Sequence, residues 1–236
     1  MIISRITQAI KDQNWSTITV EILVVIVGIL IGLQVDDLNN TRLDRAEARY
    51  YTNRLIQELD ETLDLISAEV DLAGQVLTAT AEAATMIRKG AITEDNRQYF
   101  EENFSQAFYL PDYRFPVRAL SDLRATGRLA IFEDDAVREQ LVQYEEFSSF
   151  GETQFRVVLD QFSREAVQLA KMVDLPSDYR ISRSIISPND TLNNNVQLAR
   201  MLIVIHLLQN TQRRNLEQFM KATQELRDSL AATVSS

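Results

Sequence analysis

His206 is the only histidine of the chain, and the sequence contains no cysteine. A histidine serves as a general acid or base when a neighbouring polar group fixes its ring, but Ile205 and Leu207 flank this one in an apolar run. One histidine cannot form a histidine-rich metal site, nor the two Glu-x-x-His pairs of a di-iron bundle. The sequence therefore predicts a buried structural histidine, and we expect no metal and no cofactor.

Two identical carboxylates stand next to each other at four places. Consecutive residues on a helix point about 100° apart, so such pairs do not converge on a substrate; we expect them to cap helices or to face solvent. The pairs are Asp36-Asp37, Glu101-Glu102, Asp134-Asp135 and Glu145-Glu146. Glycine-rich phosphate loops, the G-x-S-x-G elbow and the H-E-x-x-H motif are absent from the sequence. We therefore do not expect an enzyme, although Ser, Lys, Asp and Glu brought together by the fold remain an alternative.

The composition favours a helical protein that does not bind nucleic acid. The net charge is −10, and no basic run offers a face for phosphates. Without cysteine, disulfides and thiolate ligands are excluded. Only 6 glycines and 4 prolines interrupt 236 residues, and the long stretches between them suit α-helices. The predicted fold class is all-α, with one N-terminal transmembrane helix followed by a bundle of long helices.

A hydrophobic segment near the N-terminus is predicted to cross a membrane. Residues 22–33 are all apolar or glycine, and the apolar segment extends over residues 18–35, close to the ~20 residues that span a bilayer. Trp15 precedes it, where an indole prefers the lipid–water interface. A cleaved signal peptide is the main alternative, but polar and acidic residues follow the segment instead of a small-residue cleavage site. We expect a transmembrane anchor over residues 15–36 and a helical soluble domain over residues 37–236.

Four residues of this segment suggest that the anchor associates with copies of itself. Gly28 and Gly32 form a G-x-x-x-G pair, which lets two helix backbones approach closely. Glu21 places a carboxylate in the span, and Gln34 lies at its other end. Glu21 either extends to the nearby interface or, in a ring of copies, holds an oligomer together or lines a pore. We expect a homo-oligomer in the lipid bilayer.

The residues before the anchor predict a short amphipathic helix on the membrane surface. Within residues 1–14, four isoleucines share one helical face: Ile2, Ile3, Ile6 and Ile10. Arginine and lysine flank both ends of the anchor, and a count of these residues alone favours the C-terminal side as cytoplasmic. Acidic residues stand closest to the anchor on its C-terminal side, and an N-terminal signal anchor ordinarily exports the large domain behind it. We therefore expect the soluble domain on the periplasmic side of a bacterial inner membrane.

Two stretches resemble a family of uncharacterised bacterial single-pass membrane proteins. The first is E-I-L-V-V-I-V-G-I-L-I-G-L-Q-V-D-D-L-N-N at residues 21–40, and the second is A-L-S-D-L-R-A-T-G-R-L-A-I-F-E-D-D-A-V-R-E-Q-L-V-Q-Y-E at residues 119–145. Together they cover roughly a fifth of the chain. Leu38 stands where that family has tryptophan, and the N-terminus is less basic. The resemblance implies placement in the inner membrane and a helical architecture, but no activity and no catalytic residues.

The remaining sequence predicts several long helices. An apolar stripe from Leu55 to Leu77 follows spacings of three and four and suits a bundle core, with a coiled-coil seam as the alternative. Gly90 is expected to end this helix. Further helices are predicted over residues 93–109, 117–126, 135–173 and 195–232. Gly127 is expected to end one of them, and Asp134 or Asp135 to cap the start of the next. The run R-M-L-I-V-I-H-L-L-Q at residues 200–209 is too short to span a bilayer and predicts a helix buried on all sides.

Three functions are consistent with these expectations. The first is a non-enzymatic, self-associating membrane protein that acts as a scaffold or as a subunit of a larger membrane complex. The second is a helical sensor or ligand-binding domain tethered to the membrane, with a pocket bordered by residues 110–116 or 174–194. The third is an oligomeric pore lined by Glu21.

Overall fold

The computed structural model describes residues 15–176 and 183–235, and the side chains of residues 22–176 and 183–234. Over these residues the chain forms helices and no strands, which confirms the predicted all-α fold. It divides into two compact units, Met1–Tyr50 and Tyr51–Ser236. The surface helix expected over residues 1–14 lies outside the described residues. The helices are α2 (Trp15–Lys89), α3 (Arg97–Ser105), α4 (Arg118–Ala125), α5 (Asp135–Met172), α7 (Asn189–Leu192) and α8 (Val196–Ser235), with 3-10 turns η1 (Glu94–Asn96), η2 (Gln106–Phe108) and η3 (Arg128–Ile131).

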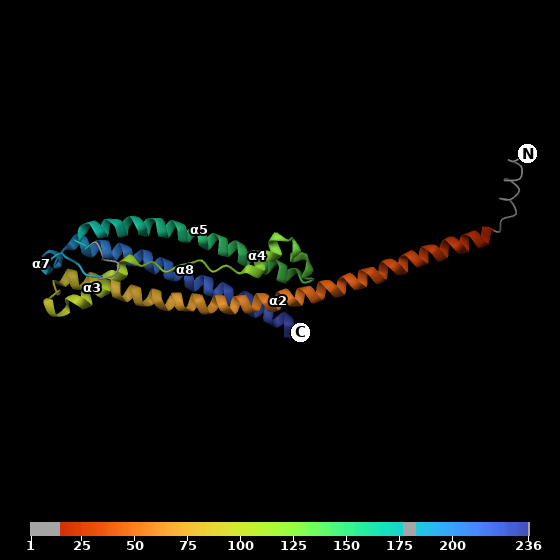
Figure 1. The fold of residues 1–236 in the computed structure, drawn as a ribbon, viewed down its shortest axis with the longest axis horizontal. Coiled ribbons are helices and arrows are strands. Elements are labelled where there is room, and N and C mark those ends of the chain that lie inside the picture. Colours follow the sequence, from red (N-terminus) through yellow and green to blue (C-terminus); the bar gives the residue numbers. More distant parts are fainter. Residues whose placement is uncertain (1–14, 177–182, 236) are drawn as a thin grey trace, which may run out of the picture. The chain divides into compact units, whose positions relative to one another are not determined.

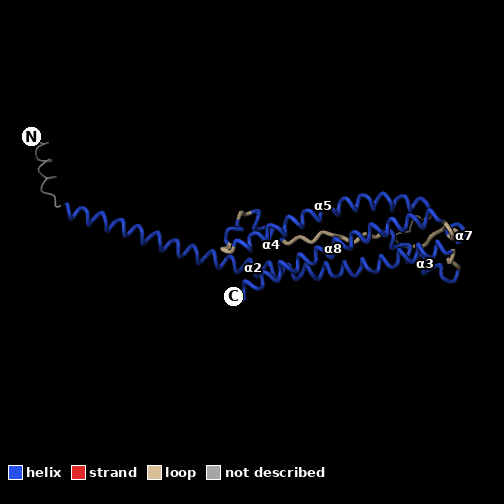
Figure 2. Tube along the Cα trace, turned by 180° about the vertical axis from the view of Figure 1, so that it is seen from behind, coloured by secondary structure: helices blue, strands red, loops and turns tan. Residues whose placement is uncertain are grey.

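Three long helices build the second unit. The part of α2 that follows residue 50 lies alongside α5 and α8 (Figures 1 and 2). The α8 helix runs antiparallel to α2, because Arg227 Nε lies 2.8 Å from Asp60 Oδ1 and His206 Nδ1 lies 3.2 Å from the Leu77 carbonyl oxygen. These two contacts fix which residues of α2 and α8 stand level with each other.

The predicted apolar stripe of α2 packs inside this unit. Its members Leu55, Leu59, Ile66 and Ala73 are buried, and so is Leu77. The interpretation as bundle core is therefore confirmed for these residues. Burial of one apolar face is what stabilises such a helix, since propensity alone leaves isolated helices marginal.

An extended segment, residues 109–117, carries the chain back along the bundle (tan between η2 and α4 in Figure 2). The carbonyl groups of residues 109–116 have no helical or sheet partners and must be satisfied by other means. Gln209 Nε2 donates to the carbonyls of Gln106 and Tyr109, each at 2.9 Å, and Gln212 Nε2 donates to the Pro111 carbonyl at 3.3 Å. Both glutamines are buried. Two core amides of α8 thus fix the path of this segment.

Aromatic rings from three parts of the second unit gather around Phe219. The rings of Tyr113, Phe115, Tyr144 and Phe147 have their centroids between 5.1 and 6.4 Å from that of Phe219. Burial raises the pKa of the Tyr144 hydroxyl to about 12 and raises the pKa of Tyr113 as well. The cluster binds the extended segment to α5 and α8.

The predicted helix ends are confirmed at three positions. Gly90 adopts φ +60° and donates to the Ile87 carbonyl at 3.1 Å, closing α2. Gly127 adopts φ +68° after α4, and the Asp134 side chain accepts from Ala136 N at the start of α5. Local turn chemistry therefore specifies these boundaries.

Arg97 of α3 makes three hydrogen bonds to the long connection between α5 and α8. Arg97 Nη2 donates to the carbonyls of Ile185 and Ser187 at 2.6 and 2.9 Å, and Nη1 donates to Asn189 Oδ1 at 2.5 Å. The same arginine forms an ion pair with Glu101 at 2.8 Å. Charge-assisted hydrogen bonds of this kind are stronger than neutral ones, so the described part of the connection is fixed in place.

The prediction for residues 200–209 was wrong in one respect. Leu202 and Ile205 are fully buried, but Ile203, Val204 and Leu207 are 43, 38 and 57 % exposed. The second unit has only two other long helices to pack against α8 among the described residues, so one side of α8 faces outward. This apolar run is thus buried on one face and open on the other.

Candidate functional site

The apolar side chains of α2 between residues 22 and 35 are exposed on every face of the helix. Every described residue from 22 to 40 is exposed, and the large apolar side chains from Ile22 to Val35 range from 43 to 61 % exposed. The helix is long and apolar enough there to cross a membrane or to be a signal sequence, and none of that stretch is buried. A row of unburied apolar side chains on every face is unfavourable in water, so this segment calls for a non-aqueous environment or a partner.

The association residues predicted from the sequence lie on this segment. Gly28 and Gly32 lie on one helical face one turn apart, and a Cβ built on either would meet no atom within 4 Å. Gln34 is exposed as well. Glu21 belongs to α2, but its side chain lies outside the described side chains. The two glycines therefore leave an unfilled strip along the helix, of the kind that permits close backbone contact.

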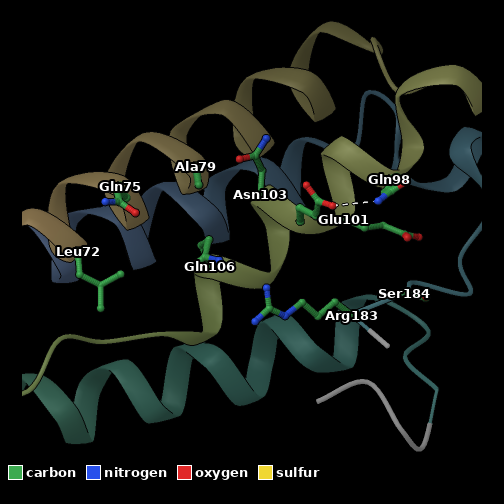
Figure 3. A pocket seen from close by; sticks show the side chains of 10 residues that line it. Leu72, Gln75, Ala79, Gln98, Glu101, Asn103, Gln106, Arg183 and Ser184 are labelled. Carbon is green, nitrogen blue, oxygen red and sulfur yellow. Dashed lines mark hydrogen bonds between the residues drawn. The ribbon is translucent and has the colours of Figure 1, made fainter. Parts of the chain in front are cut away.

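A polar cavity of about 680 Å³ lies where α2, α3 and the connection before α8 meet (Figure 3). Its walls are mostly amides and charged groups, contributed by Leu72, Gln75, Ala79, Gln98, Glu101, Glu102, Asn103, Gln106, Arg183 and Ser184. The volume lies within the range of ligand-binding sites. The sequence did not single out these side chains, although it marked the connection over residues 174–194 as the border of a pocket.

Arg183 distinguishes this cavity electrostatically. It is exposed, adopts φ +53°, and makes no hydrogen bond or ion pair with any other described residue. In Figure 3 its side chain extends towards Gln106. Glu101 is engaged by Arg97 and by Ile185 N at 2.9 Å. The cavity therefore combines one unpaired cation with two carboxylates. Glu101 already has these donors, and Glu102 accepts from Gln98 Nε2 at 3.0 Å.

A second cavity borders the other segment named from the sequence. It measures about 680 Å³ and is lined in part by Leu110, Asp112 and Arg114, facing Glu69 and Glu152. Arg114 Nη2 lies 2.7 Å from Asp112 Oδ2, and this pairing lowers the pKa of the Asp112 carboxyl. Asp112 and Arg114, two of the charged residues that line this cavity, are thus paired with each other.

His206 lies half-buried in a groove of about 660 Å³ between α2 and α8. Tyr99 and Glu82 line the same groove, and the Tyr99 hydroxyl donates to the Glu82 carboxylate. This hydrogen bond raises the pKa of Tyr99. Among the described residues no carboxylate pairs with the His206 ring, whose Nδ1 faces the Leu77 carbonyl. The histidine is therefore less buried than the sequence predicted, and its geometry is not that of a catalytic dyad.

No group of three or more His, Asp or Glu side chains suited to a metal ion occurs in the described parts of the chain. The comparisons with known proteins add no relative: no protein-family model, no curated protein and no solved structure matches this chain. The features that bear on function are therefore the exposed apolar segment, the glycine strip and the cavities.

Proposed function

We propose that this chain is a non-enzymatic single-pass membrane protein that self-associates through α2 and acts as a scaffold or as a subunit of a larger membrane complex. The observation that carries the proposal is the exposure of every apolar side chain between residues 22 and 35. Lipid tails solvate such a helix, and a helix satisfies its own backbone hydrogen bonds within the hydrocarbon.

Self-association is supported by the unfilled strip at Gly28 and Gly32. Close packing at small residues, rather than burial of apolar area, drives helix association in lipid. The second unit then stands outside the hydrocarbon, on the periplasmic side of an inner membrane as its sequence features favour. Glu21 would lie near one edge of the packed helices, where it contacts the interface or its counterparts.

Replacing both glycines with leucine tests this proposal. We expect Gly28→Leu with Gly32→Leu to weaken association in vesicles at least tenfold, about 1.4 kcal/mol, because bulky side chains hold the backbones apart. The measurement is energy transfer between donor- and acceptor-labelled full-length copies over a range of protein-to-lipid ratios. Each copy carries one introduced cysteine for the label, since the chain has none of its own.

Ile26→Leu with Leu30→Ile is the matched control, because it changes the opposite face of α2 and conserves volume. It should associate like the wild type. Energy transfer that is absent in the wild type, or equal in wild type and glycine variant, would remove self-association through this strip.

The polar cavity of Figure 3 favours a second function, ligand binding by a tethered helical domain. Its unpaired Arg183 suits a carboxylate, while Glu102 offers an acidic group for an ammonium. Arginine binds carboxylates in a bidentate manner. The ligand class that matches this lining is a small zwitterion such as an amino acid.

A thermal-shift screen of the full-length protein with the common amino acids tests this second function. Binding to the folded state alone raises the unfolding temperature, and a ligand at 100 times its Kd stabilises by about 2.7 kcal/mol. We expect Arg183→Gln to abolish the shift, and Arg164→Gln, exposed on α5 away from the cavities, to leave it unchanged. A screen without any shift, or a shift that survives Arg183→Gln, would contradict a carboxylate site at Arg183.

A further inference from the structure

The outward face formed by α2 and α8 in the second unit carries two regular rows of side chains. Residues seven apart lie nearly above one another on a helix. On α8 the row is Arg200, Leu207, Arg214 and Lys221; on α2 it is Asp64, Asp71, Thr78 and Thr85. All of these residues are exposed except Thr85, which is half-buried. One row is basic with a large apolar member, and the other is acidic with small members.

The two rows stand level with each other along the bundle. The contacts of Arg227 with Asp60 and of His206 with the Leu77 carbonyl set the antiparallel register of α8 on α2. In that register Arg214 is level with Asp71, Lys221 with Asp64, and Leu207 with Thr78. Opposite charges, and a large and a small residue, therefore occur at matching heights.

These matched groups do not satisfy one another within the chain. Asp64, Asp71 and Arg214 form no side-chain hydrogen bond or ion pair with any described residue. Lys221 reaches only Glu225 of its own helix, at 3.7 Å and with both side chains exposed. The rows thus present unpaired charge outward from two neighbouring helices.

The face also exposes apolar area that the second unit leaves uncovered. Ile203 is 43 % and Leu207 57 % exposed on α8, beside the groove between α2 and α8 that His206 and Thr78 line. Apolar side chains ringed by charge are typical of protein–protein contacts. A complementary partner therefore presents an acidic helix with small residues to α8. Beside it, the same partner presents a basic helix with a large apolar residue to α2.

We propose that this partner is a second copy of the chain, packed by a twofold axis that runs along the helices. Such an axis places α8 of one copy against α2 of the other at the same height. Arg214 and Lys221 of each copy then face Asp71 and Asp64 of its partner, and Leu207 faces Thr78. A twofold interface must be self-complementary, and this face presents both the basic row of α8 and the acidic row of α2.

The inference rests on the proposed self-association in the membrane, which it extends to the second unit. A twofold axis along the helices orients the second units of both copies in the same direction. Joining the anchors also raises the effective concentration of the second units towards the millimolar range, so a modest interface suffices. The charge pairs set the register and exclude slipped arrangements.

Charge exchange in the full-length protein tests this interface. One variant carries Arg214→Glu with Lys221→Glu, and the other carries Asp64→Lys with Asp71→Lys. Each variant alone places like charges opposite each other, whereas a mixture of the two restores opposite charges at every position. Docking is read from a disulfide between a tagged copy with Leu207→Cys and a differently tagged copy with Thr78→Cys, reconstituted together in vesicles.

We expect this disulfide in the wild-type background, a decrease of at least tenfold when both copies carry the same charge variant, and recovery in the mixture. A copy with Val167→Cys, exposed on α5, should not form the disulfide with Thr78→Cys. The inference is wrong if no disulfide forms in the wild-type background, or if the mixture forms no more disulfide than each charge variant alone. If the disulfide fails but energy transfer still depends on Gly28 and Gly32, the proposed self-association of the anchors stands. If neither the disulfide nor the energy transfer is observed, both the proposed function and this inference are overturned.

Discussion

Replacing Gly151 with alanine should lower the stability of the second unit by about 2 kcal/mol or more, since overpacking typically costs about 1–3 kcal/mol and the clash here is severe. A Cβ at Gly151 would overlap three atoms of the Tyr113 side chain, namely Oη, Cζ and Cε1. All three lie far inside van der Waals contact, so the ring or the α5 backbone must move. The measurement is the thermal unfolding temperature, for which a change of about 2 kcal/mol corresponds to roughly 4–8 °C in a domain of this size.

The Tyr113 ring has no free space to enter. Only 2 % of the residue is exposed, and its ring packs against Phe155 and Phe219 at centroid distances of 6.4 and 5.1 Å. Interiors packed at this density accept an added methyl only by shifting neighbours. Glycine at a helix interior costs about 1 kcal/mol relative to alanine, so this position retains glycine at the expense of helix propensity.

Gly74→Ala is the matched control, because it also lies within a helix and a Cβ there meets nothing within 4 Å. It should be neutral or raise stability by up to about 1 kcal/mol. Tyr113→Phe should not rescue Gly151→Ala, since Cζ and Cε1 remain in the way. Equal stability of the wild type and Gly151→Ala would contradict the packing of the extended segment against α5.

The fold class and most helix ends could be predicted because they depend on local chemistry. The spacing of Leu55, Leu59 and Ile66 marked the buried face of α2, and Gly90 and Gly127 marked helix ends because only a left-handed residue closes them well. These signals lie within a few residues of the structure that they specify.

The features that could not be predicted depend on contacts between distant parts of the chain. Nothing near Gln209 indicates that its amide binds the carbonyls of Gln106 and Tyr109, and nothing near Arg97 indicates that it holds residues 185–189. The run around His206 looked buried on all sides, because composition does not reveal how many helices surround it. Exposure of Ile203 and Leu207 depends on the packing of the whole unit.

The same distinction between local signals and contacts of distant residues applies to the candidate sites. Gly28 and Gly32 were recognised from their spacing alone, and their open strip is the consequence of an exposed helix. The cavity beside Arg183 required the fold, since α2, α3 and the connection before α8 are far apart in sequence. Only the length and polarity of that connection pointed to it beforehand.

Two aspartates in the apolar segment should release the protein from the membrane. Val25 and Ile29 lie one turn apart, 61 and 59 % exposed, near the middle of the proposed span. An aspartate at the centre of a membrane helix costs roughly 2.5–3.5 kcal/mol, so Val25→Asp with Ile29→Asp opposes insertion by roughly 5–7 kcal/mol. Val25→Leu with Ile29→Leu is the control and should stay in the membrane fraction.

Carbonate washing of membranes from cells that express the full-length chain decides whether α2 anchors the protein, with mass spectrometry of the N-terminal peptides to establish that the first forty residues are intact. We expect the intact wild type to stay in the pellet, and Val25→Asp with Ile29→Asp to move the protein to the supernatant. An intact wild-type chain in the supernatant would mean that α2 does not hold this protein in lipid.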